Sequence, residues 1–248
     1  MPKNELKTHF GKRQFEDRLY ERFSSYGIKK ANFIYWRKKT LWFTIIGTAL
    51  FVKRLVDIVG SFLGLIFLSP LFLVVAICIK LEDSKGSVFF VQKRVGKWGK
   101  EFSFPKFRSM ISNAEKLKDE ILQQNDHSES ITFKMKHDPR VTKTGYLIRK
   151  YSIDELPQLW CVLVGNMSLV GPRPAVPREV ALYSLEDRRR LEVKPGLTCI
   201  WQISGRGDIP FNKQVELDEK YIQSQSFLLD LKLILLTIPA VISGRGAY

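Results

Sequence analysis

The feature that most constrains this fold is an uncharged run of 22 residues, Ile58 to Ile79. As one straight helix, rising about 1.5 Å per residue, the run would just cross a bilayer. Pro70 lies near its middle, where it removes a backbone hydrogen bond and disfavours helical geometry at Ser69. The Ser69 hydroxyl can bond to a carbonyl that the break leaves free, which makes a kink tolerable in lipid. The run therefore predicts a broken membrane helix.

Basic residues flank this run on both sides. They are Arg37, Lys38, Lys39, Lys53 and Arg54 before it, and Lys80, Lys85, Lys93, Arg94 and Lys97 after it. Positive charge near a membrane segment prefers the cytoplasmic side, so both flanks favour the same side. We therefore expect a re-entrant helix over residues 55–80 that enters one leaflet, bends at Ser69–Pro70 and returns. A kinked full span is the alternative.

The positive charge of the chain is concentrated near its start. The formal net charge is +15, and residues 1–54 hold thirteen Lys and Arg against four Asp and Glu. Such a balance indicates an anionic membrane surface or a nucleic acid. The basic residues flank apolar segments instead of alternating with aromatics on a soluble face, which favours lipid and speaks against nucleic acid. We predict that residues 1–52 form a basic, aromatic leader on anionic membrane lipid, with a solvated amphipathic helix as the alternative for its first part.

After Lys80 the pattern changes to short β-type runs. Val88–Val95 and Glu101–Arg108 are separated by a Gly-containing turn, which predicts a β-hairpin. If the second strand continues past Pro105, its period of two puts Lys106 and Arg108 on one face and Phe107 on the other. Two cationic donors would then point together, although an exposed edge strand protected by charge explains the pattern equally well.

Most of the remaining chain reads as helices and turns. Ser112–Glu115 matches a capping box that opens a polar helix to about Gln124, and further helices are predicted near Asp154 and after Asp208. Phe227–Ile242 is apolar but interrupted by charges and a proline, which suits a helix lying in an interface. The predicted fold class is α+β, mainly helical, in a monotopic membrane protein with a re-entrant helix, a small β-hairpin and interfacial amphipathic helices.

The cysteines and histidines signal no metal site. Cys78, Cys161 and Cys199 are odd in number, far apart and set among apolar residues, so they are predicted to be small core residues in a reducing compartment. His9, His127 and His137 lack the spacing of metal ligands.

Two adjacent carboxylates, Asp154 and Glu155, have two interpretations. Ser152–Glu155 matches a capping box, but Pro157 would then disturb the helix, whereas it is harmless if Asp154 is the cap. A carboxylate at a helix start is kept ionised, which suits a cap and an anionic nucleophile alike. Taken alone, the pair favours a structural cap.

Cations beside Gly- and Pro-containing turns favour the chemical interpretation. They are Lys106, Arg108, Arg149, Arg173 and Arg206. Guanidinium and ammonium groups are the donors that hold phosphate oxygens. Adjacent carboxylates that face phosphate-binding cations indicate a divalent metal, usually Mg²⁺.

Six ordered motifs then carry a resemblance. They are Lys106–Met110 (KFRSM), Ser152–Trp160 (SIDELPQLW), Met167–Pro174 (MSLVGPRP), Lys194–Thr198 (KPGLT), Trp201–Arg206 (WQISGR) and Gly244–Tyr248 (GRGAY). In order and spacing they resemble the bacterial sugar transferase family, whose members are monotopic phosphoglycosyl transferases. The resemblance covers about Lys53 to Tyr248, so residues 53–248 are expected to form the catalytic core.

The resemblance implies a reaction and a role for each matching residue. A sugar-1-phosphate is transferred from a UDP-sugar to undecaprenyl phosphate, with release of UMP, as the first membrane step of exopolysaccharide, capsule or O-antigen assembly. Asp154 is implied as the nucleophile that forms a covalent phosphosugar intermediate, and Glu155 as the magnesium ligand. The implied substrate-binding residues are Lys106, Arg108, Arg149, Arg173, Pro174 and Arg206, and Ser69–Pro70 matches the family's membrane break.

The resemblance also implies a location, the cytoplasmic face of the bacterial inner membrane. Two other functions fit parts of the sequence: a glycosyl transferase that releases UDP, and a non-catalytic membrane adaptor that uses residues 1–54 alone. The sequence leaves open which sugar is transferred, in which pathway, and whether copies associate as a homo-oligomer.

Overall fold

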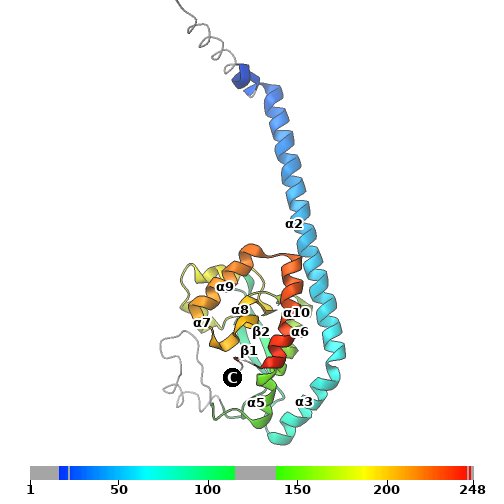
Figure 1. Cartoon of the computed structure of the whole chain (residues 1–248), viewed down its shortest axis with the longest axis vertical. Helices are drawn as coiled ribbons and strands as arrows, with labels where there is room; N and C mark the ends of the chain where they lie inside the picture. The colour runs from blue at the N-terminus through cyan, green and yellow to red at the C-terminus, as the bar shows by residue number, and fades with distance from the viewer. Residues whose placement is uncertain (1–16, 22, 115–137, 245, 247–248) are drawn as a thin grey trace, which may run out of the picture. The chain divides into compact units, whose positions relative to one another are not determined.

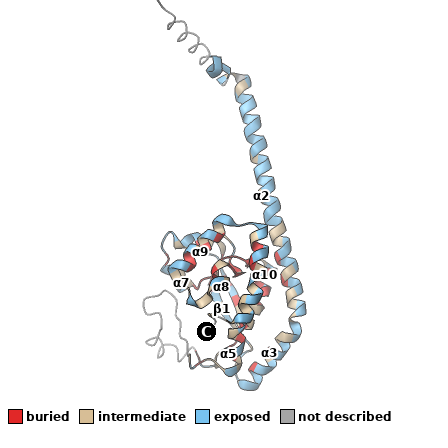
Figure 2. Cartoon of the chain, in the orientation of Figure 1, coloured by how far each residue is buried: buried red, intermediate tan, exposed pale blue. Residues whose placement is uncertain are grey.

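The computed structural model describes residues 17–21, 23–114, 138–244 and 246 of the chain (Figure 1). It divides into two compact units, Met1–Val52 and Lys53–Tyr248. Helix α2 (Ser25–Phe67) begins in the first unit and ends in the second. The part of α2 before Lys53 is exposed along most of its length (Figure 2), and there Lys39 lies 4.9 Å from the centre of the Trp36 ring. The predicted role of this first unit as a membrane-surface leader stays a prediction.

The predicted break at Ser69–Pro70 is confirmed. Helix α2 ends at Phe67, α3 (Ser69–Glu82) begins two residues later, and the two helices meet at a bend of 56°. The Ser69 hydroxyl donates to the Ile66 carbonyl at 2.7 Å. In a regular helix that carbonyl would accept from the residue at position 70, but Pro70 has no N–H. The serine therefore satisfies the carbonyl that the proline leaves free.

Within the described residues, no one helix combines the length and apolarity needed to cross a membrane, whereas the bent pair α2 and α3 meets that condition together. Length and composition alone support this, so the re-entrant course of residues 55–80 stays a prediction.

The predicted hairpin is also confirmed. Strands β1 (Phe89–Val95) and β2 (Glu101–Phe107) pair antiparallel, with Phe90 opposite Lys106, and the short helix η1 (Lys97–Gly99) connects them. Phe107 is fully buried and packs with apolar residues of α3, among them Val75 and Ile79. The hairpin thus rests on α3 and turns Lys106 to its other face.

A second small sheet forms where the sequence predicted turns but no strands. Strands β3 (Ser168–Val170) and β4 (Gly196–Thr198) pair parallel. They approach so closely that a Cβ on Gly196 would lie 2.0 Å from the Gly171 nitrogen, so glycine is required there. Because each strand has three residues, neither has the length from which alternation can be read.

The other elements are helices, most of them short, packed around these two sheets. They are α5 (Lys143–Lys150), η3 (Ile153–Gln158), α6 (Leu159–Val164), α7 (Pro177–Ala181), η4 (Asp187–Glu192), α8 (Ile200–Ser204), η5 (Arg206–Asp208), α9 (Phe211–Ser224) and α10 (Phe227–Ser243). Helix α9 begins directly after Pro210, and α10 covers the predicted apolar run, lying beside α8 (Figure 1). The described chain is therefore mainly helical with a small β-hairpin, as predicted.

The predictions for the cysteines are confirmed in part. Cys161 and Cys199 are buried, as expected, but the prediction is wrong for Cys78, which lies on the exposed side of α3. The three histidines, and the predicted polar helix from Glu115 to Gln124, lie outside the described residues.

Charged residues near the middle of α2 tie this helix to the rest of the second unit. Lys53 pairs with Asp230 of α10 and donates to the Val170 carbonyl at 3.1 Å. Arg54 donates to the carbonyls of Val162 and Leu163 at 2.7 and 2.8 Å, at the C-terminal end of α6, where a cation is favoured. The sequence indicated these two cations only as a membrane flank, but they also anchor the helix.

Asp57 makes the third anchor. Its Oδ1 accepts hydrogen bonds from the Ser168 hydroxyl at 3.0 Å and from the Leu169 N–H at 2.8 Å. The side chain is buried, so its removal would leave two donors of β3 without an acceptor inside the protein.

We expect Asp57→Ala to lower the free energy of unfolding by about 2–4 kcal/mol, because it strands buried donors. Asp57→Asn should cost less, since its amide oxygen can still accept. Chemical unfolding of the purified chain in detergent measures the effect. Glu186→Ala, at an exposed carboxylate, should stay within about 0.5 kcal/mol of the wild type. An equal loss in Glu186→Ala and Asp57→Ala would contradict the anchor.

Candidate active site

The second unit contains a cavity of about 400 Å³ that brings together most of the predicted site residues. Its walls come from the hairpin, η3, the turn after β3, η5 and α10. The predicted residues that line it are Lys106, Arg149, Asp154, Glu155, Arg173, Pro174 and Arg206. These residues are spread over about a hundred positions of the sequence, so their convergence is a property of the fold.

The two carboxylates sit in a tight turn and not at the cap of an α-helix. Ser152 has a left-handed backbone, with φ 52°, and the 3-10 helix η3 follows it from Ile153. The Ser152 side chain makes no capping hydrogen bond, so the capping-box interpretation is wrong. The prediction of Asp154 as the cap is wrong as well, since Asp154 is the second residue of η3, and the regular helix α6 begins only after Pro157.

Asp154 is buried, with 8% of its surface exposed. Burial, followed by the neighbouring Glu155 charge, raises the pKa of Asp154 to about 7, although Lys106 and Arg149 oppose the shift. The expectation that a helix start keeps this carboxylate ionised is therefore wrong. The folded environment holds it near the balance between its two protonation states at neutral pH.

Glu155 is held in the opposite state. Burial would raise its pKa, but the guanidinium of Arg173, 2.8 Å from Glu155 Oε1, acts together with the charges of Lys106 and Arg94 to lower the pKa of Glu155. Arg173 is itself positioned by the turn after β3, where Arg94 donates to the Pro174 carbonyl at 3.0 Å. Neighbouring carboxylates whose pKa values are pushed apart are typical of sites that divide two chemical roles.

Three further cations face the same cavity. Burial lowers the pKa of Lys106 to about 8. Arg149 donates from Nε to the Ser109 hydroxyl at 2.8 Å, which fixes its guanidinium. Arg206 has a left-handed backbone, with φ 51°, and its Nη1 is buried without a hydrogen-bond partner among the described residues. Such donors fit the oxygens of a phosphate group.

Arg108 does not join this group. Its guanidinium pairs with Asp83 at 2.9 Å and also donates to the Asp83 carbonyl at 2.6 Å. Strand β2 ends at Phe107, so the alternation that would align Arg108 with Lys106 stops one residue too early. The predicted pair of donors is therefore separated, and Arg108 fixes the end of α3.

Comparison with known proteins assigns the chain to a family. The sequence profile of the bacterial sugar transferases matches residues 48–244. The chain belongs to the bacterial sugar transferase family. The predicted enzyme class, a phosphoglycosyl transferase, is supported by the relatives named below.

Among similar proteins, the exopolysaccharide production protein ExoY of Sinorhizobium fredii is 43% identical over 199 residues, which cover 79% of this chain and 88% of ExoY. An undecaprenyl-phosphate galactose phosphotransferase of Salmonella typhimurium is 40% identical, over 80% of this chain and 42% of its own length. An undecaprenyl-phosphate glucose phosphotransferase of Komagataeibacter xylinus is 42% identical, over 79% of this chain and 37% of its own length. The chain thus spans most of the first relative and about two fifths of the other two.

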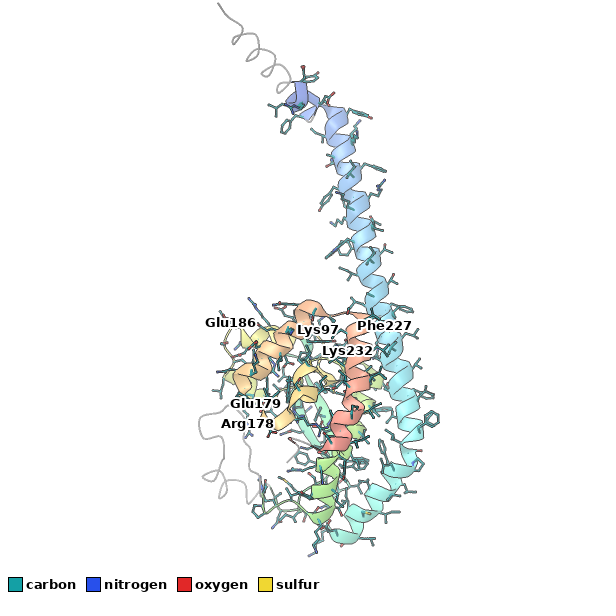
Figure 3. All side chains as sticks on the ribbon, viewed as in Figure 1. Lys97, Arg178, Glu179, Glu186, Phe227 and Lys232 are labelled. Atoms are coloured by element: carbon teal, nitrogen blue, oxygen red, sulfur yellow. The ribbon has the colours of Figure 1, made fainter. Side chains whose placement is uncertain are left out.

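Several residues that line the cavity of this transferase are not among the site residues predicted from the sequence. Arg94 and Gln92 lie on β1, and Arg178 and Glu179, labelled in Figure 3, belong to α7. The strand register could have revealed Arg94, because residues 90, 92 and 94 share the face of Lys106. Burial lowers the pKa of Arg94 to about 10.

The carboxylate pair of the transferase also fits a magnesium ion. The described residues contain no group of three or more His, Cys, Asp or Glu that could hold a metal ion. Mg²⁺, however, is commonly bound through one or two carboxylates together with substrate phosphates. Asp154 and Glu155 supply such oxygens in a cavity lined by cations, so the donor set suits a metal that arrives with a phosphorylated substrate.

The raised pKa of Asp154 predicts a pH-dependent stability. Between its ordinary value of 3.8 and about 7, folded Asp154 keeps a proton that the unfolded chain has lost. Stability is therefore lost as pH rises through this window, by up to about 1.4 kcal/mol per pH unit. We expect Asp154→Asn to gain stability relative to the wild type between pH 5 and pH 7, measured by chemical unfolding.

Ser152→Ala is the matched control, because it alters the same turn without removing a titrating group. Its difference from the wild type should stay constant over this range. A constant difference for Asp154→Asn as well would mean that Asp154 has an ordinary pKa.

Proposed function

We propose that this transferase moves a sugar-1-phosphate from a UDP-sugar to undecaprenyl phosphate and releases UMP, through a covalent intermediate on Asp154. The observation that carries the proposal is a buried carboxylate, with a pKa of about 7, in a cavity lined by Lys106, Arg149 and Arg206. A nucleophile of this kind needs cations to receive its anionic substrate, and the cavity supplies them.

In the first step, ionised Asp154 attacks the phosphorus that carries the sugar. A bond forms between a carboxylate oxygen and this phosphorus, while the bond to the bridging oxygen breaks and UMP leaves with the electron pair. The product is an aspartyl phosphosugar. Its formation requires the deprotonated carboxylate, so a pKa of about 7 leaves a substantial ionised fraction at neutral pH.

The cavity cations provide charge for the transferring phosphate. Lys106 and Arg149 face Asp154, and Arg173 holds Glu155 in its ionised state. Phosphoryl transfer depends mainly on positioning and on stabilising charge at the phosphate oxygens, which are the contributions that these side chains can make.

Glu155 is the residue that we assign to Mg²⁺, together with oxygens of the donor diphosphate. Its Oε1 accepts from Arg173, and among the described residues no hydrogen bond to Oε2 is seen, so Oε2 could ligate the metal. When bound, Mg²⁺ would neutralise charge on the diphosphate and make UMP a better leaving group.

In the second step, an oxygen of the acceptor phosphate attacks the same phosphorus. The bond to Asp154 breaks, the electron pair returns to the carboxylate, and a polyprenyl diphosphate sugar is formed. The enzyme is thereby restored to its starting state, and the two steps replace one difficult displacement.

The substrates and location are supported by the relatives' names and by the broken helix. Two relatives are named for undecaprenyl phosphate, one with galactose and one with glucose. Their identities to this chain are 40% and 42%, so the names do not distinguish the sugar. We place the enzyme on the cytoplasmic face of the bacterial inner membrane, held by a re-entrant α2–α3 pair and by the basic leader on anionic lipid, at the first membrane step of exopolysaccharide, capsule or O-antigen assembly.

To test for the intermediate, the purified transferase is mixed with each of a panel of UDP-sugars and Mg²⁺, without an acceptor. Intact mass spectrometry should find the enzyme heavier by one phosphosugar for the sugar that reacts, with UMP formed in equal amount. Asp154→Asn should give no adduct, because an amide does not attack phosphorus.

Glu155→Gln serves as the companion variant. It keeps the nucleophile but weakens the proposed metal site, so its adduct should form slowly and need more Mg²⁺. An adduct that persists in Asp154→Asn would move the nucleophile elsewhere.

A further inference from the structure

Helix α10 carries two different faces side by side. Thr237 and Val241, one turn apart, line the cavity that holds the two carboxylates. Six exposed apolar residues form what we term the α10 stripe: Phe227, Leu228, Leu231, Leu235, Ile238 and Ile242. At 3.6 residues per turn these six fall on one side of the helix, next to the face of Val241. One helix thus joins a polar cavity to an apolar outer surface.

Figure 3 helps to locate the stripe. Its labels Phe227 and Lys232 mark the first half of α10, while the cavity-lining Thr237 and Val241 belong to the second half. The N-terminal part is fixed at Asp230, which is buried and pairs with Lys53. The apolar stripe is therefore carried by a helix that is anchored in the protein at its start.

The end of α10 is fixed beside Arg206. The helix ends at Ser243, its C-cap Gly244 has φ 61°, and the carbonyl of Gly246 then accepts from the Gly207 N–H at 3.0 Å. A Cβ on Gly246 would lie 2.3 Å from the Gly205 carbonyl oxygen, so only glycine fits this close return. The chain after α10 is therefore tied to the short segment that carries Arg206.

Arg206 offers a donor at this end of the cavity. Its Nη1 is buried and has no hydrogen-bond partner among the described residues, and the side chain lines the cavity. Burial lowers the pKa of Arg206, and the charges of Glu155 and Asp154 oppose this effect in part. A buried guanidinium nitrogen without a partner is costly unless a ligand satisfies it, and phosphate oxygens do this well.

We infer that α10 receives the lipid acceptor: Arg206 binds the acceptor phosphate, and the isoprenyl chain leaves the cavity past Val241 and lies along the α10 stripe. This inference rests on the proposed function, which it extends by assigning the acceptor a path. A lipid phosphate has one doubly charged end and one long apolar end, so it needs a cationic pocket that continues into an apolar surface. Arg206, Val241 and the stripe provide these parts in that order.

The test compares two acceptors that share a phosphate but differ in chain length. Undecaprenyl phosphate and geranyl phosphate, which has two isoprene units, are given to the full chain in detergent micelles. The measured quantity is the ratio of kcat/KM for the long acceptor to that for the short one. We expect the double variant Ile238→Asn and Ile242→Asn to lower this ratio by about 10-fold or more, because it removes apolar contacts with the long chain only.

Two more variants locate the path. Val241→Trp fills the junction between cavity and stripe, so transfer to undecaprenyl phosphate should fall at least about 10-fold relative to adduct formation from the donor alone. Leu236→Asn is the matched control, because Leu236 is also an exposed leucine of α10 but points away from the stripe. Its chain-length ratio should equal that of the wild type.

Each outcome separates this inference from the proposed function. An unchanged chain-length ratio in the double variant, or an equal fall in Leu236→Asn, would overturn the acceptor path. The apolar residues of α10 would then contact membrane lipid without binding the acceptor chain. Failure of the wild type to form an adduct or release UMP would instead overturn the proposed mechanism. The chain-length ratio can still be measured in that case from total product, so the path is tested either way.

Discussion

The chemistry of this protein depends on burying an aspartate beside a second carboxylate. Two adjacent negative charges inside a protein would be unstable without compensation, and the fold compensates them unequally. Arg173 takes Glu155 into an ion pair at 2.8 Å, so Glu155 stays ionised. Burial and the neighbouring Glu155 charge raise the pKa of Asp154 to about 7, because Lys106, Arg149 and Arg173 offset them only in part. In the mechanism that we propose, this asymmetry lets Asp154 act as the nucleophile while Glu155 remains a fixed charge.

The asymmetry in turn depends on how the chain is held around the cavity. Arg94 fixes the Pro174 carbonyl, and the close pairing of β3 with β4 at Gly171 and Gly196 fixes the turn before it. Strand β3 is bound by Asp57 of α2. The same helix that is proposed to enter the membrane therefore positions the strand that leads to Arg173, so membrane anchoring and site geometry share one element.

Much of this arrangement could be predicted from the sequence where the signal is local. Pro70 and Ser69 predicted the break, because a missing N–H and a nearby hydroxyl act within one helical turn. The hairpin is predicted by two β-type runs around a Gly-containing turn, and Lys106, Arg149, Arg173 and Arg206 are predicted from their places in or beside Gly- and Pro-containing turns. The spacing of these residues could not reveal that they line one cavity, since that depends on contacts between distant segments.

The misses also have physical causes. The sequence predicts an ionised Asp154, because a helix start stabilises negative charge and the burial of this residue cannot be read from the sequence. Alternation in the sequence groups Arg108 with Lys106, but β2 ends at Phe107 and the guanidinium of Arg108 pairs with Asp83. Strands β3 and β4 have three residues each, which is too short to show the alternation of apolar and polar residues by which a strand is predicted. In the sequence, Lys53 and Arg54 are explained by the preference for positive charge beside a membrane segment. In the structure they also bind the Asp230 carboxylate and backbone carbonyls of the second unit.

In the proposed mechanism, the sugar travels together with its phosphate. The most direct measurement uses a UDP-sugar that carries ³²P in the phosphate next to the sugar, membranes containing the chain, and undecaprenyl phosphate. We predict that the label enters the lipid product and that unlabelled UMP is released. Label that remains with the nucleotide as UDP would mean transfer of the sugar alone, and would contradict the mechanism.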